Sequence, residues 1–151
     1  MAERIRPVVD LLFACDDARY DLESERWVLT NPWYAVTLPP GAAFPFVAEE
    51  FWVYAQLADG LGQFDLAVEM RHLVNDGPPR VMGWSPVTRL PFRVGDRLDA
   101  IKTAFALRRV PFREPGVYEI RVLAEGDHPG RWEPLTGVTF QLRVLDRREV
   151  V

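Results

Sequence analysis

The chain has 151 residues, which suits one domain over residues 1–151 with a hydrophobic core of its own. Lys and Arg total 18 against 22 for Asp and Glu, so the net charge is −4, which argues against a nucleic-acid partner. The single cysteine, Cys15, excludes an internal disulfide and a thiolate metal cage, and its place in an apolar segment predicts a small core residue.

The first residues carry no clear targeting signal. Residues 8–13 form a short apolar run, but Asp10 interrupts it and no small-residue cleavage site follows, so it is a poor secretory signal. No segment approaches the roughly 20 apolar residues that a membrane helix needs. We therefore expect a soluble cytoplasmic protein that binds neither membranes nor nucleic acid.

In the first half of the chain, apolar and polar residues alternate in several segments, which is typical of strands with one buried face. The polar residues 16–19 end the first predicted strand, and a break is expected at Asn31-Pro32, because proline cannot donate to a sheet. The segments 51–57 and 63–73 are separated by a short stretch with two glycines, which predicts a hairpin. The predicted strands cover residues 6–15, 27–30, 33–38, 51–57 and 63–73.

The second half continues the pattern, apart from residues 80–95, which indicate only one short irregular strand around Val87. The clearest alternation runs from Val138 to Val144, where four apolar side chains fall on one face and three polar side chains on the other. Seven to eight short strands, separated by proline and glycine turns and without a long helical stretch, predict an all-β fold, an antiparallel sandwich or barrel, of which we expect the β-sandwich. The later strands are predicted at residues 103–110, 117–124 and 137–145.

The segment Pro115-Gly116-Val117-Tyr118 looks like the corner of immunoglobulin-like sandwiches, where a tyrosine near a strand start returns its hydroxyl to the nearby backbone. We therefore expect the sandwich to be immunoglobulin-like.

Three short apolar stretches occur in order along the chain. They are Leu12-Phe13-Ala14-Cys15-Asp16-Asp17, Trp27-Val28-Leu29-Thr30-Asn31-Pro32, and Phe51-Trp52-Val53-Tyr54-Ala55-Gln56-Leu57 leading into Gly62-Gln63-Phe64-Asp65-Leu66. Together with the corner at Tyr118, they resemble a bacterial family of small uncharacterised β-sandwich domains. The resemblance spans most of the chain, although residues 80–100 depart from it. It implies a β-sandwich of unknown function and transfers no catalytic residue.

No group of residues in the sequence predicts a reaction centre. His72 lies on the apolar face of its strand and is expected to be a buried or half-buried structural ring bonded to the backbone. The acidic pairs Asp16-Asp17 and Glu49-Glu50 point to opposite faces within each pair, so a glycosidase site would need one member of each pair to converge. We expect no enzyme activity, no catalytic residue, no metal and no cofactor.

Aromatic residues give the one positive signal for function. Trp52 and Tyr54 face away from the apolar positions of their strand, so both faces of this strand are predicted to be covered. The cover is either the loop of residues 39–48, through Phe44 and Phe46, or an external partner.

Three functions follow from these observations. The first is a non-enzymatic binding or assembly domain that associates with itself, or with another protein, through an aromatic sheet face at Trp33, Trp52 and Tyr54. The second is a carbohydrate-binding module that uses Trp33, Trp52 or Trp84 as a stacking platform. The third is a small hydrolase with carboxylate chemistry, which would need a cluster of Asp16 and Glu49 with His72.

Overall fold

The computed structural model describes residues 4–33, 35–37, 44–93 and 100–145. These residues form eleven strands and no helix, which confirms the all-β prediction. Within these ranges no helix has the length and apolar character needed to cross a membrane. The strands are β1 (Val8–Asp21), β2 (Arg26–Pro32), β3 (Ala35–Thr37), β4 (Phe46–Ala58), β5 (Gly62–Leu73), β6 (Arg80–Trp84), β7 (Thr88–Phe92), β8 (Ile101–Phe112), β9 (Gly116–Glu125), β10 (Trp132–Pro134) and β11 (Phe140–Leu145).

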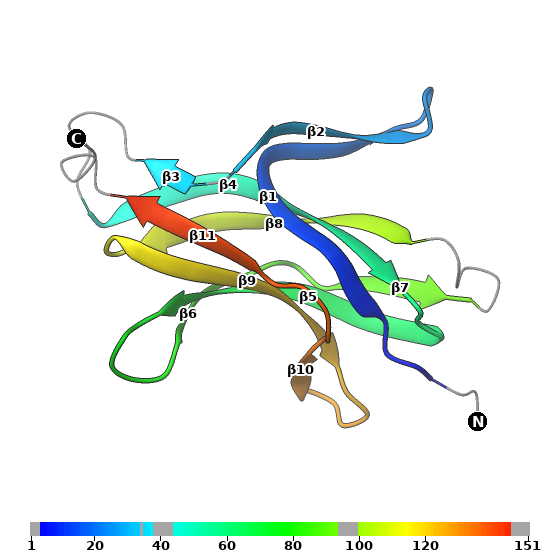
Figure 1. Ribbon diagram of the computed structural model, residues 1–151. Coiled ribbons are helices and arrows are strands. Elements are labelled where there is room, and N and C mark those ends of the chain that lie inside the picture. Colours follow the sequence, from blue (N-terminus) through cyan, green and yellow to red (C-terminus); the bar gives the residue numbers. More distant parts are fainter. Residues whose placement is uncertain (1–3, 34, 38–43, 94–99, 146–151) are drawn as a thin grey trace.

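The strands form two sheets that lie one above the other (Figure 1). The first sheet has the order β2-β1-β4-β8. The second has the order β3-β11-β9-β5-β6, with β10 beside β9 and β7 beside β5. Neighbouring strands are antiparallel except for β3 and β11, which are parallel, so the prediction of a wholly antiparallel fold is wrong at this edge.

The described residues form more strands than the seven to eight predicted, because two short strands pair with successive parts of one long strand. β7 pairs with the first half of β5 and β6 with the second half. In the same way, β11 pairs with the first half of β9 and β10 with its last three residues. The number of strands therefore exceeds the prediction without making the second sheet wider.

The chain crosses from one sheet to the other directly after β4. Because β4 lies in the first sheet and β5 in the second, the predicted hairpin between these strands is wrong. Asp59 turns the corner with a φ of 61°, and a Cβ at Gly60 would lie 2.8 Å from the ring of Phe92. The crossing lets the inward side chains of both strands share one core, where burying each large side chain stabilises by roughly 1.5–3 kcal/mol. The buried residues are Phe51, Val53, Ala55 and Leu57 of β4, with Phe64, Leu66, Val68 and Met70 of β5.

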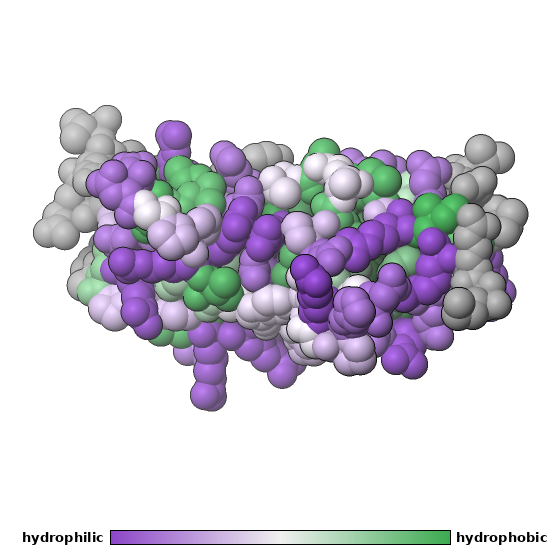
Figure 2. Space-filling model, turned by 90° about the horizontal axis from the view of Figure 1, so that it is seen from below, coloured by the Kyte–Doolittle hydropathy of each residue, from purple (hydrophilic) through white to green (hydrophobic). Residues whose placement is uncertain are grey.

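The second sheet carries cross-strand ion pairs between β5 and β9. Arg121 Nε donates to Glu69 at 2.9 Å, and Arg71 Nε donates to Glu119 at 2.8 Å. These residues alternate with the core residues of both strands, so they lie on the outer face, as the sequence predicts for β5. Figure 2 shows the lower side of the molecule as mostly hydrophilic. One face of this sheet is therefore apolar and the other is charged.

In the first sheet, the alternation of inward and outward side chains changes phase within β4 and within its partner β8. Ala48 and Phe51 of β4 both belong to the core although they are three residues apart, and Glu49 and Glu50 between them are exposed. On β8 the change occurs at Arg109, which has a φ of 51°. A positive φ is uncommon for residues other than glycine, so it marks a local distortion of the strand.

A similar distortion lies between β1 and β2. Asn31 has a φ of 51°, and its Nδ2 donates to the carboxylate of Asp16 at 2.7 Å. Beyond this point β1 continues, with Tyr20 paired to Trp27 of β2, so the prediction that residues 16–19 end the strand is wrong. Figure 1 shows β1 bending sharply, so that the hairpin of β1 and β2 lies over the first sheet.

The hydrogen bond predicted for the corner at Tyr118 is present. Tyr118 Oη donates to the carbonyl oxygen of Glu114 at 2.7 Å, and its ring is fully buried. Burial raises the pKa of Tyr118 above its ordinary value. Gly116 enters β9 with a φ of 151°, and a Cβ there would lie 2.9 Å from Nε2 of His72, so the corner requires glycine.

The last strand gives a direct test of the alternation. Leu142 is 0% exposed, whereas Gln141 is exposed and faces Glu119 on β9. We expect Leu142→Lys to prevent folding, because an unpaired buried charge costs about as much as the whole stability of a small domain. The control Gln141→Lys should change the free energy of unfolding by less than about 0.5 kcal/mol. Thermal unfolding followed by circular dichroism measures both, and an unchanged Tm for Leu142→Lys would contradict the burial.

Candidate functional site

Trp33 lies where the chain leaves β2 and passes to the second sheet. Its backbone N–H donates to Ala14 O at 2.8 Å, and its ring packs on Phe51 with 4.6 Å between ring centroids. The indole Nε1–H donates to the carboxylate of Asp16, which also accepts from Asn31. Asp16 therefore holds the indole of Trp33 in one orientation.

Tyr54 and Trp52 lie on the outer face of the first sheet, away from the Phe51 side on which Trp33 packs. Tyr54 is 4% exposed, and its ring lies 5.4 Å from that of Phe13 and 5.8 Å from that of Trp27. Trp52 is half-buried, and its Nε1 donates to Glu50 at 3.1 Å. The three residues predicted as one interface are therefore not brought together on one face.

The cover over Tyr54 comes from a different segment than the sequence predicts. Trp27 belongs to the hairpin of β1 and β2, which folds back over the sheet and places its ring against Tyr54. Phe44 and Phe46, the predicted cover, pack against the core instead. The chain therefore covers Tyr54 itself, through Trp27 of the predicted strand 27–30, which the sequence pattern did not place over this face.

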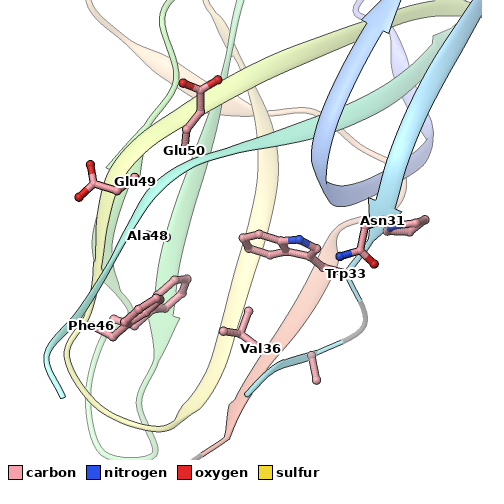
Figure 3. A pocket seen from close by; sticks show the side chains of 10 residues that line it. Asn31, Trp33, Val36, Phe46, Ala48, Glu49 and Glu50 are labelled. Carbon is pink, nitrogen blue, oxygen red and sulfur yellow. The ribbon is translucent and has the colours of Figure 1, made fainter. Parts of the chain in front are cut away.

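An open pocket of about 500 Å³ lies between β3 and the first residues of β4 (Figure 3). We call it the Trp33 pocket. Apolar side chains form most of its lining, with one amide and two carboxylates. The lining residues are Asn31, Pro32, Trp33, Ala35, Val36, Phe46, Ala48, Glu49, Glu50 and Phe112.

The walls of the Trp33 pocket come from both sheets. β3 joins the second sheet through its parallel pairing with β11 and contributes Val36, whereas β4 of the first sheet contributes Phe46 and Ala48. Figure 3 shows the rings of Trp33 and Phe46 on opposite sides of the pocket, with Val36 between and below them. Phe46 and Ala48 lie on the inward side because the alternation of β4 changes phase after Ala48.

The rim of the Trp33 pocket is acidic. Figure 3 shows Glu49 and Glu50 extending from β4, away from the apolar side chains. Glu50 accepts from Trp52 Nε1 and lies 3.3 Å from Nε of Arg108. Among the described residues, Glu49 takes part in no ion pair. The arrangement suits an apolar group that carries a positive charge.

The carboxylates do not meet His72. His72 is 6% exposed and stacks on Tyr118 with 4.5 Å between ring centroids, which confirms its predicted burial. Its Nδ1 lies 3.5 Å from Glu114, and it lines a different, smaller cavity of about 190 Å³. The cluster of Asp16, Glu49 and His72 that a hydrolase would need is therefore not formed. Among the described residues, no group of three His, Cys, Asp or Glu side chains is placed to hold a metal ion.

A second cavity, of about 690 Å³, lies between the hairpin of β1 and β2 and the outer face of the first sheet. We call it the hairpin groove. The sequence pattern does not predict this groove, although Tyr20 and Trp27 are placed symmetrically about a polar turn, as cross-strand partners are. Its lining residues are Leu11, Phe13, Tyr20, Glu25, Arg26, Trp27, Leu29, Tyr54, Gln56, Ala100 and Lys102.

A family model described as "Family of unknown function (DUF6941)" matches residues 10–134 of the chain. The matched span begins in β1 and ends with β10, so it contains all the residues that line the two cavities. No curated protein matches the chain.

Cys15 tests whether the distorted part of β1 is closed to solvent. The side chain is 0% exposed, and burial, together with the nearby carboxylates of Asp17 and Asp16, raises the pKa of the thiol from 9.0 to about 11. The neutral thiol therefore supports the fold fully below pH 9, and this contribution is lost as the pH rises from 9 to 11. We expect a disulfide reagent such as dithiobisnitrobenzoate to leave the native thiol unmodified at pH 8 and to titrate it in guanidinium chloride. Rapid native reaction would show that Cys15 is accessible.

Proposed function

The chain belongs to the DUF6941 family, whose function is unknown, and we propose that it is an immunoglobulin-like, non-enzymatic binding domain. Its ligand site is the Trp33 pocket, which takes an apolar group next to a positive charge. The observation that carries the proposal is an apolar pocket of about 500 Å³ that opens between the two sheets beside an acidic rim.

Strand order and the tyrosine corner support the immunoglobulin-like assignment. β1, β4 and β8 follow the order of strands A, B and E in such domains, and β5, β9 and β11 follow that of strands C, F and G. The hydroxyl of Tyr118 returns to the backbone at the start of the strand that corresponds to F. The hairpin end at β2 and the parallel strand β3 are additions at the edges of this arrangement.

The composition of the Trp33 pocket supports a binding role. Ligand sites are mostly apolar cavities of roughly 300–1,000 Å³ with a few polar groups that fix orientation. Trp33, Phe46 and Phe112 provide the apolar surface. Phe46 and Phe112 are partners on β4 and β8 of the first sheet, and Trp33 follows β2. The indole of Trp33 is already oriented by Asp16, so binding would not need to order it.

The acidic rim supports a cationic group in the ligand. Arg108 offsets the charge of Glu50, whereas Glu49 has no such partner among the described residues. A lysine, an arginine or an alkylammonium beside an apolar group would place its charge at this rim. A partner protein with an apolar side chain flanked by basic residues offers the same chemistry.

Three probes with one hexyl chain and different head groups test this proposal. Hexylammonium should bind more tightly than hexanol, and heptanoate should bind most weakly, because only the head group on the hexyl chain differs at the acidic rim. Glu49→Gln should reduce the preference for hexylammonium by about threefold, which is the scale of an exposed ion pair. Shifts of the Trp33 indole N–H resonance in NMR titrations measure all three affinities.

Two variants make the test specific. Val36→Trp should fill the Trp33 pocket and abolish binding of all three probes, whereas Glu23→Gln, the same change in charge at the hairpin turn, should leave the affinities unchanged. Equal affinity of the wild type for the three probes would contradict the proposal that the ligand carries a positive charge. Unchanged binding of the probes by Val36→Trp would contradict the proposal that the Trp33 pocket is the binding site.

Self-association through the first sheet is a second proposal. β8 is twelve residues long and, among the described strands, pairs within its sheet only with β4, and such an edge can pair with another chain. Trp52 is half-buried and lies opposite Ala106 of this strand. Trp52→Asp should convert a dimer at micromolar concentration to monomer in sedimentation experiments, while Trp84→Asp on the other sheet should not. A wild-type chain that is monomeric under these conditions contradicts the proposal.

A further inference from the structure

The aromatic rings of the hairpin groove do not stack on one another. Trp27 meets both Tyr20 and Tyr54 with 5.8 Å between ring centroids and an interplanar angle of 62°, and Phe13 meets Tyr54 at 46°. In an edge-to-face pair, only one of the two rings has a face covered by its partner. The groove therefore keeps apolar ring faces that a ligand can cover.

Tyr20 contributes more to the groove than to the fold. Its side chain is 47% exposed, and Trp27 is the one aromatic ring that it meets among the described residues. Phe13 and Trp27 already cover Tyr54, which is 4% exposed. A half-exposed ring at the mouth of a cavity is available for a ligand without a loss of core packing.

The polar side chains of the groove present both donors and acceptors. Gln56 Nε2 donates to Tyr54 Oη at 3.0 Å, which leaves the amide oxygen of Gln56 as an acceptor. Glu25 adds a carboxylate, and Arg26 and Lys102 add cationic donors. The lining therefore carries charges of both signs, one negative and two positive, for a net charge of +1.

The geometry of the hairpin groove points to a carbohydrate-binding site. A sugar ring has apolar C–H faces, which cover aromatic rings, and a rim of hydroxyl groups, each of which donates and accepts hydrogen bonds. The groove offers both complements, with Tyr20 and Trp27 as the ring surface and Gln56 as the central polar contact. Its volume of about 690 Å³ lies within the range of ligand sites.

This site is separate from the Trp33 pocket. The two cavities share no lining residue, and they differ in chemistry, since one is an apolar cavity with an acidic rim and the other an aromatic groove with charges of both signs. Carbohydrate binding can therefore fail while the Trp33 pocket binds its own ligand, and the reverse also holds.

Titration with defined trisaccharides tests the inference. Cellotriose, maltotriose and chitotriose are added to the full chain, and tryptophan fluorescence and NMR shifts of the Trp27 indole N–H are recorded. We expect at least one trisaccharide to saturate, and Tyr20→Ala to weaken its binding about tenfold, a loss of about 1.4 kcal/mol. Gln56→Ala should weaken binding while leaving the Tm close to that of the wild type.

Trp84→Ala is the matched control. Trp84 is 42% exposed and meets Trp132 edge to face, much as Tyr20 meets Trp27, but it lies on the second sheet. This variant and Val36→Trp should bind the trisaccharide with unchanged affinity. Three results would overturn the inference: no saturation by any trisaccharide, an equal loss in Trp84→Ala, or tighter binding of indole, which has an aromatic face without hydroxyl groups.

Discussion

The carboxylate of Asp16 is the group on which both candidate sites depend. It accepts hydrogen bonds from Asn31 and Trp33 where the chain leaves the first sheet for the second. On one side of this point, the hairpin of β1 and β2 turns back over the sheet and closes the hairpin groove. On the other side, the ring of Trp33 lies against Phe51 and forms a wall of the Trp33 pocket. One exposed carboxylate thus holds together the segments from which a wall of each cavity extends, although it lines neither cavity.

Both cavities lie where the regular alternation of the first sheet is interrupted. The core between the sheets follows period two and provides stability. At Asn31 and Arg109, by contrast, the backbone has a positive φ, which residues other than glycine seldom adopt. These distortions place Ala48 inward, Glu49 and Glu50 at a rim, and the hairpin over the outer face. Strained positions that persist in a fold tend to cluster at functional sites, and the two cavities agree with that tendency.

The sequence predicts the inward residues of β4, β5, β9 and β11 well, because period two is a local property of each strand. It also predicts the hydrogen bond of Tyr118, since the corner is a short local motif. It fails where distant contacts decide. Residues 16–19 look like a strand end but continue β1, because their partners on β2 and the bond between Asp16 and Asn31 hold them extended. The crossing after β4 looks like a hairpin, since its length and glycines suit either connection. The cover of Tyr54 depends on a bend that no local pattern encodes.

The parallel pairing of β3 with β11 ties an early part of the chain to a late one. Ala35 pairs with Arg143, so this wall of the Trp33 pocket gains its neighbour only after most of the polypeptide has left the ribosome. Contacts of such long sequence separation form late, because the entropy of closing the loop must be met first. The hairpin of β1 and β2, by contrast, finds its partner within a few residues. During synthesis, the hairpin of β1 and β2, which covers the hairpin groove, can therefore form well before the Trp33 pocket exists.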